Sequence, residues 1–275
     1  MESRNPQPPV PDRRAGGPPR ILALWSAPRS RSTAFFRMMA ERGDFAVVHE
    51  PFSYLAEFGR TAVDGETVHT ERDLIESLRR MGGRAPVFFK DTTDERYPGL
   101  LEDTRFLRDD AAHTFIIRHP KQTIASYYAI NPQVKLHQIG LESQHELFTR
   151  VEALTGRMPL VIDSDELVAD PAGLVAAYCA RLGIPYRADA LTWRPGDRAE
   201  WQPSARWHET VSTSSGFHGG SAVPPRERVD VDTHPVLRGY LKHHLPYYEA
   251  LRERRMAADP AAGTAQDTPV TVNGQ

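Results

Sequence analysis

The chain has 275 residues, of which 40% are hydrophobic and 25% charged, and its formal net charge at pH 7 is -2. That charge excludes nucleic-acid binding by bulk positive charge, and the single cysteine excludes an intrachain disulfide and a cysteine-rich zinc site. No apolar run approaches the roughly 20 residues of a membrane span, and the first residues are polar and proline-rich, unlike a signal peptide. We therefore expect a soluble, cytoplasmic protein with no membrane or nucleic-acid partner; its oligomeric state stays open.

Three parts of the chain differ in composition. Residues 1–19 contain several prolines and paired glycines with little to bury, which predicts a disordered leader, and residues 259–275 predict a disordered tail in the same way. Residues 20–258 between them alternate apolar runs with helical patterns. We expect this middle part to form one domain.

The elements of the domain are predicted in chain order from these patterns. Strands are expected at 20–26, 45–49, 86–89, 114–117 and 160–162. Helices are expected at 32–42, 70–81, 120–130, 144–155, 171–182 and 237–255, the last broken at Pro246. Residues 192–233 hold three of the four tryptophans among polar residues and prolines, which predicts a long, partly ordered loop. Alternating strands and helices predict a three-layer α/β fold with a central, mainly parallel sheet flanked by helices.

The loop after the first strand is the most informative segment. In LWSAPRSRSTAFFR, residues 24–37, Arg29 and Arg31 alternate with the hydroxyls of Ser30, Ser32 and Thr33 just before a helix. A helix N-terminus attracts anions, and guanidinium groups donate paired hydrogen bonds to phosphate or sulfate oxygens. The loop lacks the glycines and lysine of a Walker-type ATP site. It predicts an anion site; the simpler alternative is a serine cap beside solvated arginines.

A second pattern follows the fourth predicted strand. In TFIIRHPKQTIASYY, residues 114–128, Arg118 ends the strand, Pro120 begins a helix and Ser126 lies on that helix. Open α/β sheets bind ligands at the carboxyl ends of their strands, where Arg118 is expected. The alternative is a surface arginine and an unrelated serine on the face of the helix.

Together the two patterns resemble those of sulfotransferases that use 3′-phosphoadenosine-5′-phosphosulfate (PAPS). SAPRSRST resembles the loop that binds the 5′-phosphosulfate, with Arg29 in place of the usual lysine, and RHPKQTIAS is similar to the motif for the 3′-phosphate. HEPFS, FFKD and the late WRPG…W…WH…SSGF are similar to a bacterial branch of the P-loop sulfotransferase superfamily. One departure is Gln122, where the family often has an acidic residue.

The resemblance implies a P-loop-type fold and an activity. A sulfuryl group would move from PAPS to a hydroxyl or amine of a small-molecule acceptor, leaving 3′-phosphoadenosine-5′-phosphate (PAP). It implies a loop site that binds the 5′-phosphosulfate, formed by Arg29, Ser30, Arg31, Ser32 and Thr33. It also implies that Arg118 and Ser126 bind the 3′-phosphate. The sequence does not show which molecule is the acceptor.

The catalytic candidates lie at the ends of the second and third strands. Glu50 is the first choice as base, because several sulfotransferase branches use a glutamate in this region, and His49 competes because imidazole titrates near neutral pH. Pro51 disfavours the α conformation at Glu50, so we expect an extended residue there. The strand pleat should then point His49 and Glu50 in opposite directions. Lys90 is predicted to neutralise the leaving phosphate together with Arg29.

The segment from residue 201 to residue 228, which we call the late segment, offers weaker candidates. Trp201, Trp207 and His208 are expected to stack on the nucleotide or to line the acceptor pocket. SSGFHGG, residues 214–220, is expected to close over the nucleotide, and Arg226 or Arg228 to reach the 3′-phosphate. The histidines show no metal-ligand spacing such as H-E-x-x-H, so no metal is expected.

Two other functions remain open from the sequence. One is a P-loop nucleotide kinase or NTPase, because residues 88–91 and 160–163 each lead from apolar residues to an aspartate, as in a magnesium-binding strand. The other is a non-catalytic relative that only binds nucleotide.

Overall fold

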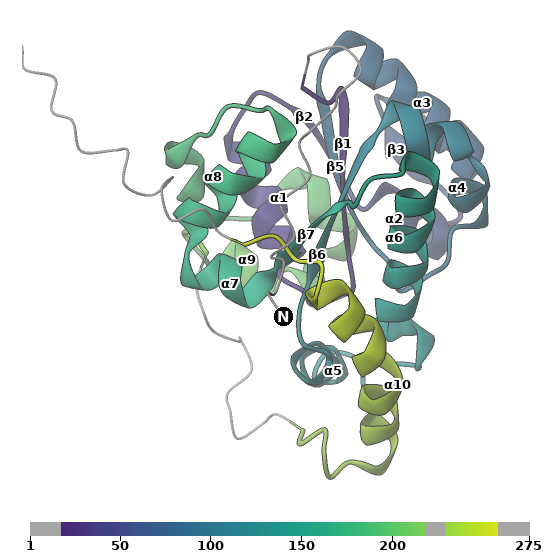
Figure 1. Ribbon diagram of the computed structural model, residues 1–275, viewed down its shortest axis with the longest axis vertical. Coiled ribbons are helices and arrows are strands. Elements are labelled where there is room, and N and C mark those ends of the chain that lie inside the picture. Colours follow the sequence, from purple (N-terminus) through teal and green to yellow (C-terminus); the bar gives the residue numbers. More distant parts are fainter. Residues whose placement is uncertain (1–17, 218–228, 258–275) are drawn as a thin grey trace, which may run out of the picture.

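A five-stranded parallel sheet forms the centre of the molecule (Figure 1). The computed structural model describes residues 18–217 and 229–257. The sheet order is β2-β5-β1-β6-β7, and the strands are β1 (Ile21–Ser26), β2 (Ala46–His49), β5 (Val87–Thr92), β6 (Ala112–Ile117) and β7 (Leu160–Asp163). All four neighbouring pairs are parallel. The predicted three-layer α/β fold is confirmed.

Helices cover both faces of the sheet, so the central strands have no solvent face. The α-helices are α1 (Ser32–Glu41), α2 (Pro51–Phe58), α3 (Glu71–Arg84), α4 (Pro98–Glu102), α5 (Pro120–Tyr128), α6 (Leu141–Thr155), α7 (Ser164–Ala169), α8 (Pro171–Leu182), α9 (Glu209–Ser212) and α10 (Pro235–Arg252). Short additional elements are the hairpin of β3 (Thr61–Val63) and β4 (Glu66–Val68), the π-helical turn Phe106–Asp110, and the 3-10 helices His137–Ile139, Ala188–Leu191 and Ala199–Trp207.

Alternate residues of β1 enter two separate hydrophobic cores. Ile21 and Trp25 pack into the core beneath α3, α6 and the end of α10, whereas Leu22 and Leu24 pack into the core beneath α1 and α8. Successive side chains of a strand point to opposite faces, and a strand buried on both faces is apolar throughout. This burial explains why the central strands could be predicted from apolar runs in the sequence.

The connection order places a ligand crevice beside β1. After β1 the chain crosses to β2 at one edge and returns through β5, while β6 and β7 build the other side of the sheet. The loops after β1 and β6 therefore leave the sheet in opposite directions at neighbouring strands. Such a switch point is where open α/β sheets bind ligands.

Several predictions about the later elements are wrong. Residues 199–212 are largely helical rather than a loop, because Trp201 is fully buried in the second core and fixes this segment. α10 continues through Pro246, since Tyr248 and Leu251 beyond it are buried in the first core. That packing outweighs the ~3 kcal/mol cost of an interior proline.

Few of the expectations about the two ends of the chain can be compared with the structure. Most of the predicted leader and all of the predicted tail lie outside the described residues. Within the described ranges, no helix is both long and apolar enough to cross a membrane.

Candidate active site

A cavity of about 550 Å³ opens at the carboxyl ends of the strands. Its walls come from the loops after β1, β5 and β6, from α1, α2 and α5, and from residues 204–217. One end, which we call the donor end, contains Arg29, Arg31 and Arg118. We call the part of the wall formed by a second group of residues the acceptor end: Glu57, Asp94, Glu95, Tyr127, Asn131 and Gln138.

The loop between β1 and α1 has an unusual backbone. Arg29 and Arg31 have φ values of 66° and 63°, in the left-handed region that residues other than glycine rarely adopt. Such conformations cost of the order of 1–3 kcal/mol and cluster at functional sites. No side chain caps the N-terminus of α1, so its first N–H groups face the loop without a side-chain partner. The loop has the geometry of an anion site.

A buried glutamine anchors this loop to the sheet. The Gln144 side-chain oxygen accepts a hydrogen bond from the Ala27 amide at 3.3 Å. The Gln144 amide nitrogen donates to the carbonyls of Trp25 and Ile116 at 3.1 and 2.9 Å. No local pattern indicates this role for Gln144, because the glutamine is 117 residues from the loop amide that it binds.

The two sequence signatures meet in space at the donor end. Arg29 Nε donates to Ser126 Oγ at 3.1 Å, across a separation of 97 residues. Arg118 Nη1 donates to the Arg29 carbonyl at 3.0 Å. Arg29 Nη1 also donates to the Trp207 carbonyl at 2.6 Å, which joins the late segment to the loop. Both predicted phosphate-binding patterns therefore line one continuous surface of the cavity.

The other predicted loop residues are placed differently from one another. Arg31, Ser32 and Thr33 line the cavity, and Arg31 also pairs with Asp165 on α7. The Ser30 side chain is fully buried and is not part of the cavity wall, and its hydroxyl has no hydrogen-bond partner within the described ranges. A side-chain contact from Ser30 to a ligand is therefore not supported by this geometry.

Glu50 and Lys90 form a buried ion pair in the cavity wall. Burial alone would raise the pKa of Glu50, but the neighbouring Lys90 ammonium, together with His49 and His208, lowers it to about 2. The Glu50 amide also donates to the Lys90 carbonyl at 2.7 Å, so the backbone fixes the pair. Glu50 is therefore ionised at neutral pH and lies beside a cation.

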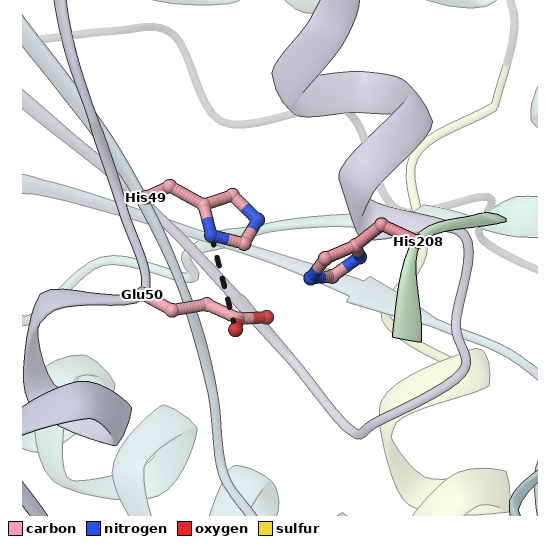
Figure 2. A group of neighbouring side chains, drawn as sticks. All are labelled: His49, Glu50 and His208. Carbon is pink, nitrogen blue, oxygen red and sulfur yellow. Dashed lines mark ion pairs between the residues drawn. The ribbon is translucent and has the colours of Figure 1, made fainter. Parts of the chain in front are cut away.

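The expected extended conformation at Glu50 is wrong. Its φ and ψ are 46° and 45°, because α2 begins at Pro51 and the chain must turn at Glu50. Asp91 fixes that turn by accepting hydrogen bonds from the amides of Phe52 and Ser53 at 2.6 and 3.1 Å. The alternation of the strand is broken here, so His49 and Glu50 point into the same region with Nδ1 and Oε2 3.8 Å apart (Figure 2).

His49 lies behind Glu50 rather than in the cavity wall. It is buried, and its Nδ1 shares a hydrogen bond of 2.9 Å with the Tyr54 hydroxyl. Burial lowers the pKa of His49 well below its usual value. This position disfavours His49 as the group that meets an acceptor.

His208 occupies the position in the wall that the sequence suggested for His49. Its Nδ1 lies 3.1 Å from Thr33 Oγ1 and its Nε2 lies 2.9 Å from Ser204 Oγ. Burial lowers the pKa of His208 to about 4; Glu50 opposes this change, and Lys90 and Arg29 add to it. The ring is therefore neutral at pH 7 and links the late segment to the loop. Its predicted place in the pocket is consistent with this geometry.

The group formed by His49, Glu50 and His208 could hold a metal by distance alone. Their ligand atoms all lie within 4.8 Å of one another, and the three side chains converge in Figure 2. However, the Lys90 ammonium already pairs with Glu50, and both ring nitrogens of His208 have hydrogen-bond partners. These contacts fit an ion pair joined to a hydrogen-bond network better than a divalent cation.

The two aspartates that suggested a magnesium-binding strand serve another role. Asp91 holds the first turn of α2, and Asp163 Oδ1 accepts from the amides of Asp165 and Glu166 at 2.8 and 3.5 Å at the start of α7. Neither aspartate belongs to the cavity wall.

Only some of the residues that were expected at the site from the late segment line the cavity. Trp207, Ser214, Gly216 and Phe217 line the cavity, whereas Trp201 packs on Phe36 and His49 in the core. Arg226, Arg228 and residues 218–220 lie outside the described residues.

The fold and the two joined signatures define a cationic site at the carboxyl edge of a parallel sheet, and comparison with known proteins identifies the family. Residues 20–255 match the family model described as "Sulfotransferase domain". The chain belongs to the sulfotransferase family, which confirms the resemblance read from the sequence.

Individual relatives are more distant. A curated Arabidopsis thaliana relative, "Branched-chain-amino-acid aminotransferase-like protein 2", is 30% identical over 245 residues, which cover 84% of this chain and 41% of that protein. The chain thus spans about two-fifths of the length of the curated relatives it matches.

Solved sulfotransferase structures are similar along most of the chain. A sulfotransferase from Alicyclobacillus acidocaldarius has 15% identity and a TM-score of 0.48, covering 88% of this chain and 98% of its own. A mouse sulfotransferase complexed with PAP has 15% identity and a TM-score of 0.42, covering 85% and 88% of the two chains.

Proposed function

We propose that the protein transfers a sulfuryl group from PAPS to a hydroxyl or amine of a small-molecule acceptor. The single observation that supports this most directly is the contact of Arg29 with Ser126 and of Arg118 with the Arg29 carbonyl. It joins the motif for the 5′-phosphosulfate to the motif for the 3′-phosphate at one end of one cavity. The 3′-phosphate distinguishes PAPS from ATP, so a site with both motifs favours PAPS.

The donor end would bind PAPS through cations and helix N–H groups. Arg29, with Ser32 and Thr33 at the start of α1, would contact the 5′-phosphosulfate, and Arg118 and Ser126 would contact the 3′-phosphate. Guanidinium groups bind such oxyanions in bidentate fashion and remain charged when partly buried.

The transfer would be an in-line displacement at sulfur. A bond forms between the acceptor oxygen or nitrogen and sulfur, while the bond from sulfur to the bridging oxygen breaks and that oxygen keeps the electron pair. The acceptor proton passes to Glu50, which lines the cavity beside the reacting centre. Lys90 and Arg29 stabilise the negative charge on the departing phosphate.

The ion pair of Glu50 and Lys90 fits both roles. With Lys90 beside it, Glu50 is a weak base, because the pKa of this carboxyl is about 2. An anionic donor beside Lys90 offsets the ammonium charge, which raises the pKa of Glu50 when PAPS is bound. The base would therefore strengthen when the donor is in place.

The alternatives are less well supported. The sequence suggested a magnesium-dependent kinase because of Asp91 and Asp163, but both of these carboxylates cap helices outside the cavity wall. A relative that only binds nucleotide would have no need of a glutamate and a lysine in the cavity wall.

Donor choice in the absence of metal tests this proposal. The protein is incubated in EDTA with PAPS and a mixed panel of phenols, sugars and amines, and PAP is quantified by chromatography; ATP with magnesium is run in parallel. We expect acceptor-dependent PAP release in EDTA and no turnover of ATP. Magnesium-dependent ATP turnover without PAP release would contradict the proposal.

A further inference from the structure

The two ends of the cavity have opposite charge. Three arginines line the donor end, whereas Glu57, Asp94 and Glu95 line the acceptor end. No salt bridge of Glu57 or Asp94 occurs among the residues that the structure describes, and Glu95 has only His137 at 3.9 Å. Arg206 also borders this end, but it is exposed and stacks on Trp207 with its guanidinium 4.9 Å from the ring centroid. Carboxylates predominate over cations at this end.

A tyrosine side chain also lines this space. Tyr127 on α5 is 5% exposed and lines the cavity, and its hydroxyl makes no hydrogen bond within residues 18–217 and 229–257. Burial raises the pKa of Tyr127, and Asp94, Glu57 and Glu95 raise it further, while Arg206 has the smallest effect, in the opposite sense. A hydroxyl in the cavity wall that makes no hydrogen bond to the protein can donate to or accept from a bound ligand.

Asp94 is placed to act together with the catalytic pair. Lys90 and Thr92 lie on the same face of β5, about 6.6 Å apart at the rise of a strand. The Thr92 hydroxyl donates to Asp94 Oδ1 at 2.6 Å, which directs the carboxylate beyond the end of the strand. A group bound to Asp94 would therefore lie beyond the end of β5, on the same side of the sheet edge as the Glu50–Lys90 pair.

We propose that the acceptor carries a protonated amine, which Asp94 binds with help from Glu57 and Glu95 while Glu50 faces the hydroxyl that receives the sulfuryl group. This inference rests on the proposed function and specifies the acceptor as a small hydroxylated amine, of the amino alcohol or amino sugar class. Tyr127 accepts a hydrogen bond from the ammonium group. A carboxylate or sulfate at this position would be repelled by the three acidic side chains.

Matched ligand sets test the acceptor class apart from the donor site. PAP is titrated first by calorimetry; its binding shows that the donor site functions, and no binding at all would overturn the proposed function and the acceptor class together. With PAP saturating, two sets are then titrated, each with an amine, a neutral and an acidic member: glucosamine, glucose and glucuronate; tyramine, 4-ethylphenol and 3-(4-hydroxyphenyl)propionate.

The expected result is at least a tenfold tighter binding of the amine in one set. Asp94→Asn should reduce that preference to less than threefold, and Glu102→Gln, which removes an exposed carboxylate outside the cavity wall, should leave it unchanged. If PAP binds and neither amine is preferred tenfold, whether or not the members bind, the acceptor class is wrong while the donor site stands. A preference that survives in Asp94→Asn also overturns it.

The pH dependence gives a second readout. Burial raises the pKa of Asp94 to about 6, with Glu50 adding to the change and the Thr92 hydrogen bond opposing it. Because only the ionised carboxylate attracts an ammonium group, the amine preference should fall as the pH drops from 7.5 through 6. It should stay constant over this range in Asp94→Asn; an unchanged preference in the wild-type chain would contradict the role of Asp94.

Discussion

The two ends of the cavity are built in different ways. At the donor end the cations are held by the protein itself: Arg29 by Ser126 and Trp207, and Arg31 by Ser164 and Asp165. At the acceptor end, Glu57 and Asp94 have no ion-pair partner among the described residues. The donor end is thus organised before any ligand arrives, as suits a fixed co-substrate, whereas charge at the acceptor end is left for the ligand to satisfy.

Loss of the proposed base, Glu50, should have the largest effect. Glu50→Gln should lower the turnover rate by about 10²–10⁴, the usual contribution of a general base, with much less change in PAP affinity. Quenched-flow measurement of PAP release, with calorimetric titration of PAP, checks both quantities.

A control variant also replaces Lys90, because Glu50→Gln alone would leave this lysine buried without its ion-pair partner. Removing one partner of a buried pair costs about 3–5 kcal/mol, so Glu50→Gln with Lys90→Met should recover stability without recovering rate. Full turnover in Glu50→Gln would exclude this residue as the base.

A change behind the donor loop should weaken donor binding. Gly140 has a φ of +81°, and a Cβ there would lie 2.9 Å from Pro28 Cδ and 3.0 Å from the Thr93 carbonyl. Gly140→Ala should displace Pro28, cost about 1–3 kcal/mol of unfolding free energy and weaken PAP binding about tenfold. Urea unfolding and calorimetry measure the two effects.

Gly43→Ala is the matched control. Gly43 has a similar φ of +70°, but a Cβ there meets nothing within 4 Å. It should show the backbone cost of about 1 kcal/mol and normal PAP binding. Equal PAP affinities for the two variants would mean that the Gly140 contact does not shape the donor end.

The last effect concerns the neutral histidine shared by the loop and the late segment. His208 has a pKa of about 4 in the folded protein and an ordinary value of 6.5. Between these values the unfolded chain binds a proton that the folded protein does not. His208 therefore stabilises the fold fully above pH 6.5, and this contribution is lost as the pH falls towards 4.

The slope of stability with pH isolates that contribution. One proton corresponds to about 1.4 kcal/mol per pH unit, and His208→Gln should reduce the slope between pH 6.5 and 4 by this amount. Urea unfolding at several pH values measures it. Burial also lowers the pKa of His113 to about 4, and this residue contributes equally to the slope in the wild-type protein and in His208→Gln. An unchanged slope would show that His208 is not held neutral.

Much of the donor end was predictable because its signals are local. The strand, the loop with Arg29 and Arg31 and the start of α1 are contiguous, and Arg118 and Ser126 sit on one strand end and the next helix. The sheet was readable because central strands are apolar on both faces.

The acceptor end could not be predicted in the same way. Glu57, Asp94 and Tyr127 come from three elements and meet only through the topology of the sheet. The turn at Glu50 depends on Asp91, 39 residues from the amide that it binds, and propensity rules for a residue before proline gave the wrong conformation. His208 reaches Thr33 across 175 residues, so no local pattern could show their contact.

The most direct test of a PAPS site is the contribution of the 3′-phosphate to binding. PAP, AMP and ATP are titrated calorimetrically into the 275-residue chain in EDTA, and into its Arg118→Ala and Arg105→Ala variants. Arg105 has 72% of its side chain exposed and lies outside the cavity wall, so its variant is the control. We predict that PAP binds at least 100-fold more tightly than AMP, and that only Arg118→Ala removes this difference. Equal affinities of the wild-type protein for PAP and AMP would contradict the account.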